Sequence, residues 1–203
     1  MLLNFENLSV NAVYYTMIQT IVPRPIAWVL SEHDNGAHNL APFSYFNGVS
    51  SNPPIVSISV GRKDNGSQKD TWHNIEQRSN FVIHIPHREL AEQVTASAAS
   101  LDAGESEIDL IRMETTSTEG WPLPRLSEAR IALLCERFAI HALGAAPQGL
   151  ILGRIMSAYL DDSIASHEGK RLTISAKRLD PIARLGGNDY ATLGDILTIE
   201  RPK

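Results

Sequence analysis

Short hydrophobic runs, each ended by turn-forming residues, dominate the pattern of the chain. Ile26–Leu30 is rich in strand-forming residues, and Asn35-Gly36 follows it, a dipeptide that suits the positive φ angles of a tight hairpin. His38–Ser44 is expected to be the returning strand. Residues 55–60 alternate apolar and polar side chains for part of their length, as a half-buried strand does.

Two helical patterns interrupt these strands. The first is expected to start with Asp70 or Thr71 as its N-cap and to carry Trp72 and Ile75 on one face. The second covers about residues 88–99, where apolar side chains recur on one helical stripe. Residues 100–124 show little periodicity and are expected to form a long excursion with a short helix near 108–111.

The order of the elements favours one class of fold. Further strands are expected over 81–85, 131–142, 149–160 and 172–179, which gives six or seven strands that do not alternate regularly with helices. This order favours a mainly β, antiparallel barrel with helical insertions over a doubly wound parallel sheet. No repeat or linker marks a boundary, so residues 1–203 are expected to form a single domain.

Composition and charge exclude several classes of protein. With 43% hydrophobic and 20% charged residues the chain has the composition of an ordinary globular protein. The net charge of -5 disfavours nucleic-acid binding. The single cysteine, Cys135, allows no intrachain disulfide and fits a reducing compartment, where it is expected to be a buried small hydrophobe. The first ten residues lack the pattern of a signal peptide, and no run approaches the roughly 18 apolar residues of a membrane span, so a cytoplasmic protein is expected.

The motifs of several enzyme classes are missing from the sequence. It contains no Rossmann, P-loop, nucleophile-elbow or zincin signature. His84 and His87 are the closest pair of histidines, but Pro86 lies between them and a zinc site needs three or four convergent ligands. No metal site and no pair of acid-base carboxylates is therefore predicted.

The stretch from Asn39 to Pro54 is rich in small polar residues and contains two proline groups and Gly48, which exclude a regular helix. Its backbone groups need other hydrogen-bond partners. A flavin ring offers such partners at its polar edge and an apolar face for Phe43 or Tyr45. The alternative is an irregular strand crossover whose aromatic side chains belong to the core.

Cations, hydroxyls and the start of a helix coincide in residues 61–71. This combination suits a phosphate group, which binds to exposed N–H groups and positive charge. Asp70 would repel a phosphate unless it turns inward to cap the helix, which would leave Lys69 and Thr71 for the anion. A capped helix after a charged hairpin is the alternative.

In this order, the segments PRPIAWVLS, NLAPFSYFNGVSSNPP, SVGRKDNGSQKDTWHNI and FVIHI resemble the flavin reductase-like family of FMN-binding split barrels, which includes flavoredoxin-type proteins. The segment from Arg184 to Tyr190 is similar to the R-L-G-G-x-x-Y element near the end of many members. His84 departs from the family pattern, which more often has a polar amide there.

The resemblance implies a Greek-key-like split β-barrel that forms a homodimer, with FMN near the subunit interface. It implies a ring site formed largely by the backbone of Ala41, Pro42, Phe43 and Ser44. It assigns the ribityl chain and phosphate to Ser50, Ser51, Arg62, Lys69 and Thr71, with help from Arg24. Tyr190 is expected to lie near the flavin or to close its pocket.

The implied activity needs no catalytic side chain, because flavin N5 carries the hydride or electron transfer. The leading hypothesis is an FMN-dependent oxidoreductase that takes hydride from NAD(P)H and passes electrons to free flavin, a partner oxygenase or an electron-transfer protein. The first alternative is an FMN-holding electron carrier or storage module that does not react with NAD(P)H. The second is a split barrel that has lost flavin and binds another ligand.

Overall fold

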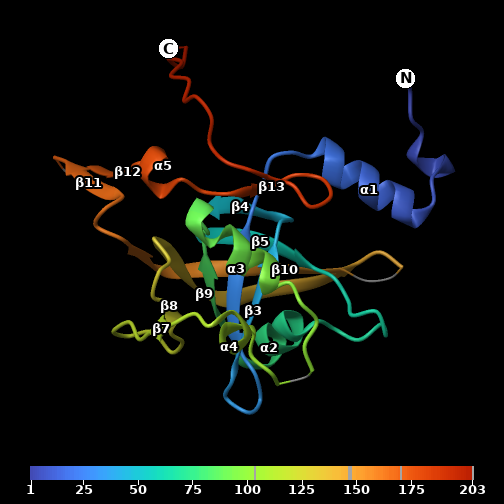
Figure 1. Cartoon of the computed structure of the whole chain (residues 1–203), viewed down its shortest axis with the longest axis horizontal. Coiled ribbons are helices and arrows are strands. Elements are labelled where there is room, and N and C mark those ends of the chain that lie inside the picture. The colour runs from blue at the N-terminus through green and yellow to red at the C-terminus, as the bar shows by residue number, and fades with distance from the viewer. Residues whose placement is uncertain (103, 146–147, 170, 203) are drawn as a thin grey trace.

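The computed structural model describes residues 1–102, 104–145, 148–169 and 171–202. Its centre is a seven-stranded antiparallel sheet with the strand order β3-β2-β6-β9-β10-β5-β4 (Figure 1). The seven strands are β2 (Ala27–Glu32), β3 (His38–Phe43), β4 (Phe46–Ser51), β5 (Pro54–Val60), β6 (Asn80–His84), β9 (Ile131–Leu143) and β10 (Gln148–Leu160).

Smaller elements surround this sheet. The helices are α1 (Val10–Thr20), α2 (Asp70–Arg78), α3 (Ala91–Ala96), α4 (Glu107–Ile111) and α5 (Ala176–Leu179), with 3-10 turns η1 (Phe5–Asn7) and η2 (Arg88–Leu90). The short strands are β1 (Arg24–Pro25), β7 (Thr115–Thr116), β8 (Arg125–Leu126), β11 (Ala165–Glu168), β12 (Arg171–Ile174), β13 (Ala183–Arg184) and β14 (Tyr190–Ala191).

The sheet curls until strands from both of its ends share one core. Phe43 of β3 and Val56 of β5 belong to the same buried cluster, although their strands lie near opposite ends of the strand order. Trp72 and Ile75 of α2 pack into this cluster and close one end of the barrel. Side chains alternate across each strand. Ala27 and Val29 therefore face this inner cluster, whereas the intervening Trp28 belongs to a second cluster.

The second cluster lies on the outer face of the sheet, where α3 and α4 cover it. Leu30 and Val82 from the strands meet Val94 of α3 and Ile108 of α4. The fully buried His84 side chain is fixed beside this layer by two hydrogen bonds. Its Nδ1 donates to the Trp28 carbonyl at 3.0 Å, and its Nε2 accepts from the Leu126 N–H at 3.0 Å. Burial lowers the pKa of His84 to about 4, so the imidazole is neutral and structural.

Two glycines on β10 let large side chains reach the barrel interior. A Cβ atom on Gly149 would lie 2.7 Å from the Trp72 ring, and one on Gly153 would lie 2.5 Å from the Phe81 ring. The pairing of β10 with β9 shifts register next to Gly153. Cys135 of β9 is also buried in this interior, as expected, and burial raises the pKa of its thiol to about 12.

The structure confirms the antiparallel, mainly β architecture and corrects several local predictions. Residues 172–179 are not one strand, because Ser175 caps the short helix α5 with a hydrogen bond to the Arg178 N–H. In the 33–37 hairpin, Gly36 has a φ of 81° but Asn35 does not have a positive φ. Helix α1 was not predicted, and it has one buried residue, Ile18.

The stretch from Asn39 to Pro54 is more regular than expected. Most of it forms β3 and β4, which pair with β2 and β5. Much of its backbone hydrogen bonding is therefore used within the sheet.

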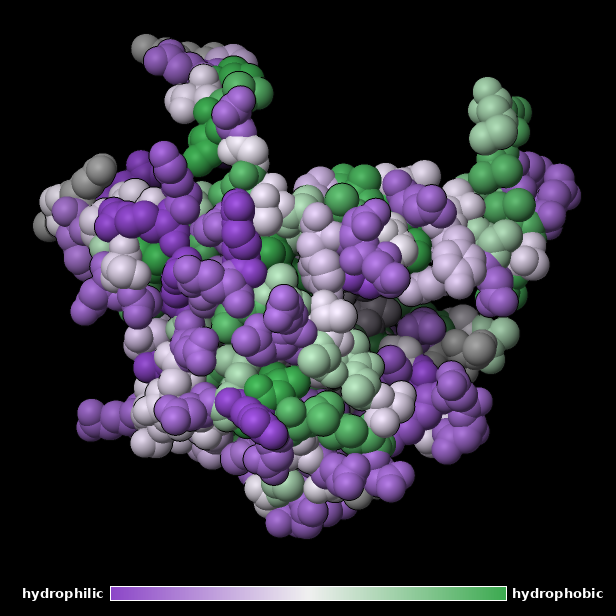
Figure 2. Space-filling view, viewed as in Figure 1, coloured by the Kyte–Doolittle hydropathy of each residue, from purple (hydrophilic) through white to green (hydrophobic). Residues whose placement is uncertain are grey.

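Both ends of the chain project from the barrel (Figure 1). Figure 2 shows apolar side chains on these two projections. They include Leu2, Leu3 and Phe5 near the N-terminus and Ile196, Leu197 and Ile199 near the C-terminus. Among the described residues, no helix combines the length and apolar character needed to cross a bilayer.

Candidate functional site

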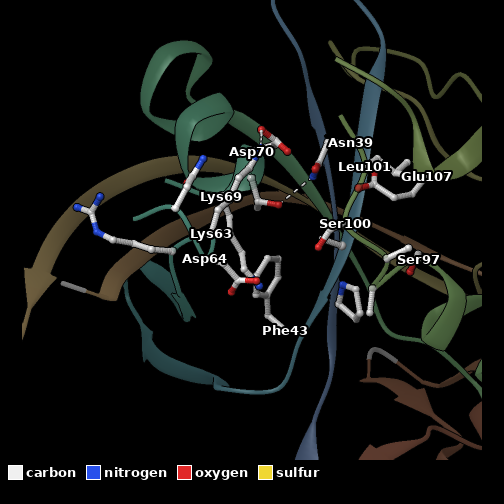
Figure 3. Close-up of a pocket in the computed structure, with 17 residues that line it drawn as sticks. Asn39, Phe43, Lys63, Asp64, Lys69, Asp70, Ser97, Ser100, Leu101 and Glu107 are labelled. Atoms are coloured by element: carbon white, nitrogen blue, oxygen red, sulfur yellow. Dashed lines mark hydrogen bonds and ion pairs between the residues drawn. The ribbon is translucent and has the colours of Figure 1, made fainter. Parts of the chain in front are cut away.

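A pocket of about 440 Å³ opens where β3, the start of α2 and the segment after α3 meet. Figure 3 shows its lining residues, with Lys63 and Lys69 on one side and Ser97 and Leu101 on the other. The strand contributes Asn39, Ala41, Pro42 and Phe43. The hairpin and α2 contribute Arg62, Lys63, Asp64, Asn65, Lys69, Asp70 and Thr71. The third wall contains Ser97, Ala98, Ala99, Ser100 and Leu101, together with Glu107.

The β3 wall has a polar and an apolar end. Asn39 is buried and hydrogen-bonded to Thr71, whereas Phe43 at the other end of the strand belongs to the inner core. Ala41 and Pro42 lie between them and are half-buried. A long ligand along β3 would therefore meet polar groups at one end and an aromatic ring at the other.

The cationic wall begins where the hairpin passes into α2. Lys69 is the N-cap of this helix and is exposed, and its side chain has no acceptor atom that could cap the helix N–H groups. The first N–H groups of a helix have no carbonyl partner within the helix. The Arg62 guanidinium lies 5.2 Å from the centroid of the Trp72 ring and donates to the Gly66 carbonyl at 2.8 Å.

Asp70 does not cap the helix, which corrects the prediction that either Asp70 or Thr71 is its N-cap. Its carboxylate accepts a hydrogen bond from Lys63 Nζ at 2.8 Å, and both side chains are partly buried (Figure 3). The charge that would repel an anion is thus compensated by Lys63. The described residues provide no ion-pair partner for Lys69, so its charge is available to a ligand.

Hydrogen bonds fix the third wall to the barrel. The Ser97 hydroxyl accepts from the Trp28 indole N–H at 2.9 Å and donates to the Val94 carbonyl at 3.0 Å. Farther along, Glu107 Oε2 accepts from the Leu40 N–H at 2.8 Å. These contacts place a run of small residues opposite Lys69, and so leave room between the two walls.

Glu107 is a buried carboxyl group at the edge of this pocket. Burial raises its pKa, and the Asp70 charge raises it further, while the Leu40 N–H and the Lys63 charge act in the opposite direction. The net shift is upward, so Glu107 holds a proton more readily than an exposed glutamate does.

Six of the eleven predicted site residues surround the pocket: Ala41, Pro42, Phe43, Arg62, Lys69 and Thr71. The other five lie outside its lining. Ser50 and Ser51 are exposed on β4. The Tyr190 hydroxyl lies 2.9 Å from Thr95 Oγ1, and the Tyr190 ring lies 4.5 Å from the Arg184 guanidinium.

Arg24 and Ser44 have a different arrangement. The Arg24 side chain is buried, and its guanidinium donates to the carbonyls of Ile18, Ile21 and Leu185 at 2.5, 2.8 and 2.9 Å. Its Nε donates to Ser44 Oγ at 3.3 Å. Arg24 therefore links α1 to the segment that follows β13.

Sequence reasoning missed the third wall. Residues 96–100, Ala-Ser-Ala-Ala-Ser, begin at the last residue of α3 and carry no charge or aromatic ring. The run of five small side chains was the one sequence feature that could have indicated this wall. The place of Glu107 at the pocket could not be predicted from the sequence around it, because its burial depends on α4 packing against β3.

Comparisons with known proteins agree with this architecture. The family model described as "Flavin reductase like domain" matches residues 19–179. The uncharacterized protein YwrF of Bacillus subtilis is 36% identical over 201 residues, covering 97% of each chain. The crystal structure of nitrilotriacetate monooxygenase component B from Bacillus cereus is 34% identical, covers 98% of each chain and superposes with a TM-score of 0.91.

A second solved structure is more distant. The 2-nitrobenzoate 2-nitroreductase NbaA of Pseudomonas fluorescens is 26% identical, with a TM-score of 0.86 over 100% of this chain and 96% of the other. The family model covers all seven strands of the barrel and all three walls of the pocket. The chain therefore belongs to the flavin reductase-like family, and its fold is the split β-barrel of that family.

Proposed function

We propose that the pocket binds FMN and that the protein is an oxidoreductase that passes hydride or electrons from NAD(P)H through FMN to an acceptor. One observation carries the proposal: the strand from Asn39 to Phe43 and the helix entry at Lys69 line the same pocket. Membership of the flavin reductase-like family supports a redox role.

The residues present fit the two chemically different ends of FMN. Lys69 and the uncapped first turn of α2 suit a phosphate, since they supply positive charge and N–H donors. Ala41, Pro42 and Phe43 suit the ring, because they combine backbone groups with an aromatic side chain. The small residues 97–100 leave space for the ribityl chain, and the volume lies in the usual range of cofactor sites.

The protein's part in the reaction is to bind and orient. Bound flavin supplies the hydride and electron transfer itself. The backbone along β3 holds the ring edge, Lys69 and Thr71 hold the phosphate, and the small-residue wall leaves room for the ribityl chain. We assign no general acid or base. Five other residues remain predicted contacts of FMN, although they do not line the pocket: Arg24, Ser44, Ser50, Ser51 and Tyr190.

We also propose a homodimer with FMN near the subunit interface. Exposed apolar side chains on α1, on the edge strand β4 and on the C-terminal segment support a protein partner. Examples are Tyr14, Val49 and Leu197. A partner monooxygenase is the proposed electron acceptor, since the similar protein from Bacillus cereus is named as one component of a monooxygenase.

Purified protein tests the proposal directly. We expect a yellow protein with a flavin absorption spectrum, release of FMN identified by mass, and NADH or NADPH oxidation faster than with FMN alone. If FMN binds but NAD(P)H does not bleach the protein under anaerobic conditions, the electron-carrier alternative replaces the reductase. If no flavin binds at micromolar concentrations, the proposal is wrong.

A further inference from the structure

A buried hydrogen-bond network lies directly behind the phosphate side of the pocket. Its members are almost completely buried: Ser31, Asn39, Thr71 and Asn74 are each 0–2% exposed. They come from β2, β3 and α2, so the network joins the helix that would face the phosphate to two strands of the barrel. Only Asn39 and Thr71 belong to the lining of the pocket.

The direction of the hydrogen bond between Asn39 and Thr71 is fixed by the chemistry of the two groups. An amide nitrogen carries two hydrogens and donates both. Asn39 Nδ2 lies 2.8 Å from Thr71 Oγ1, the contact dashed at Asn39 in Figure 3. It also lies 3.3 Å from Ser31 Oγ, so both of its hydrogens have an acceptor. Thr71 is therefore the acceptor in its bond to Asn39.

This direction leaves the single hydroxyl hydrogen of Thr71 for another acceptor. Among the described residues, no hydrogen-bond acceptor takes it up. The Thr71 side chain lies on the pocket wall next to Lys69 and in the first turn of α2. A phosphate oxygen in this place would receive the hydroxyl hydrogen together with the Lys69 charge.

The rest of the network holds Asn39 in this orientation. Ser31 Oγ also accepts from Asn74 Nδ2 at 3.1 Å. Asn74 Nδ2 lies 3.5 Å from His33 Nδ1, and His33 Nε2 lies 3.1 Å from the Glu105 carbonyl. Because the Glu105 carbonyl can only accept, the His33 hydrogen is on Nε2 and its Nδ1 accepts from Asn74. In this network the amide groups of Asn39 and Asn74 are the donors, and Ser31 Oγ and His33 Nδ1 are their acceptors.

We propose that Asn39 is a positioning residue that dedicates the Thr71 hydroxyl hydrogen to the phosphate of FMN, an inference that rests on the proposed function. Asn39 acts through Thr71 and does not itself need to touch the ligand. It selects for flavins that carry a phosphate, since riboflavin has no phosphate oxygen to accept this hydrogen.

The test compares the dissociation constants of FMN and riboflavin, measured by fluorescence quenching, in the wild type and in three variants. Thr71→Val removes the hydroxyl and keeps the shape of the side chain, so it should weaken FMN binding about tenfold and leave riboflavin binding unchanged. Asn39→Ala should also lower the preference for FMN. In the Thr71→Val background, Asn39→Ala should cause no further loss of that preference.

Ser175→Ala is the matched control. It removes a hydroxyl that caps α5 and belongs neither to the network nor to the pocket lining, so it should lower the thermal midpoint without changing the preference for FMN. If Asn39→Ala does not fold, Asn39→Asp replaces it. The carboxylate has nearly the same volume but accepts the Thr71 hydrogen, so the loss of preference should be larger than with alanine and should shrink in the Thr71→Val background.

Two results overturn the inference while leaving the proposed function intact. One is an Asn39 variant that weakens FMN and riboflavin equally. The other is a loss of preference that persists at full size in the Thr71→Val background. If the wild-type protein binds neither flavin, the proposed function fails and the inference fails with it, which the first measurement of the series reveals.

Discussion

The ring of Phe81 occupies the space where a side chain on Gly153 would lie: a Cβ atom there would be 2.5 Å from Phe81 Cζ. Phe81 lies on β6 and Gly153 on β10, the two strands that flank β9 in the sheet, and Phe81 is completely buried. The glycine therefore lets the largest side chain of β6 fill the interior.

Gly153→Ala should destabilise the protein by about 1–3 kcal/mol, because Phe81 or β10 must shift to admit the methyl group. Urea unfolding of the purified variant measures the change. Gly48→Ala on β4 is the control, since nothing lies within 4 Å of its Cβ position and its φ is not positive. Equal stability of the two variants would contradict the close packing of Phe81 on β10.

His84 should make the protein sensitive to acid. Its pKa is lowered from 6.5 to about 4 by burial, so the unfolded chain takes up a proton at a higher pH than the folded protein does. The stability that the neutral imidazole contributes is present above pH 6.5 and is lost as the pH falls toward 4, by roughly 3 kcal/mol in total. The free energy of unfolding, measured across this range, should show the loss in the wild type and in His141→Gln, which changes an exposed histidine. In His84→Gln this part of the pH dependence should be missing.

Glu107 should have the opposite effect on stability. Burial raises its pKa above the ordinary value of 4.5, so the folded protein holds this proton to a higher pH than the unfolded chain does. The associated stability is present below pH 4.5 and is lost as the pH rises through the raised pKa. Glu107→Gln keeps an oxygen for the Leu40 N–H and carries no charge. Flavin-free Glu107→Gln should thus gain stability over the wild type as the pH rises from 4.5 to 8, and a gain that is the same at all pH values would argue against a raised pKa.

Lys69 should bind FMN through its charge. Lys69→Ala should weaken FMN binding about tenfold at low salt, since it removes a charged donor to the phosphate. The loss should become smaller as the salt concentration rises. Lys177→Ala, an exposed lysine on α5, is the control and should leave the dissociation constant unchanged. A salt-independent loss in Lys69→Ala would instead indicate a change in the shape of the helix entry.

Strands could be predicted where apolar and polar side chains alternate, or where a short apolar run is followed by turn-forming residues. Residues 26–30 and 81–85 were identified because their side chains are buried on both faces of β2 and β6. Helix α1 was missed because only Ile18 is buried along its length while Tyr14 and Tyr15 are exposed, so no apolar stripe marks it. Its one local signal was Ser9, which caps the helix by accepting from the Ala12 N–H.

The candidate site could be predicted where its residues are neighbours in the sequence. Lys69 and Thr71 stand together at a helix start, and Ala41 to Phe43 are consecutive. The pairing of Asp70 with Lys63, by contrast, depends on the 62–68 hairpin folding back on the helix, and the helix-capping rule alone favoured the wrong partner. The third wall depends on Trp28 reaching Ser97 across 69 residues of chain, which no local pattern reveals.

The hydrogen bonds of Arg24 limit how far the chain can be shortened. Two of its acceptors, the Ile18 and Leu185 carbonyls, lie outside the 19–179 range of the family match. A fragment trimmed to that range would lose two of the three carbonyl acceptors of the Arg24 guanidinium, and with them the pairing of β1 with β13. The smallest fragment that keeps every carbonyl acceptor of this cation extends from Ile18 to Leu185, well past the Ala27 and Leu160 limits of the barrel strands on both sides.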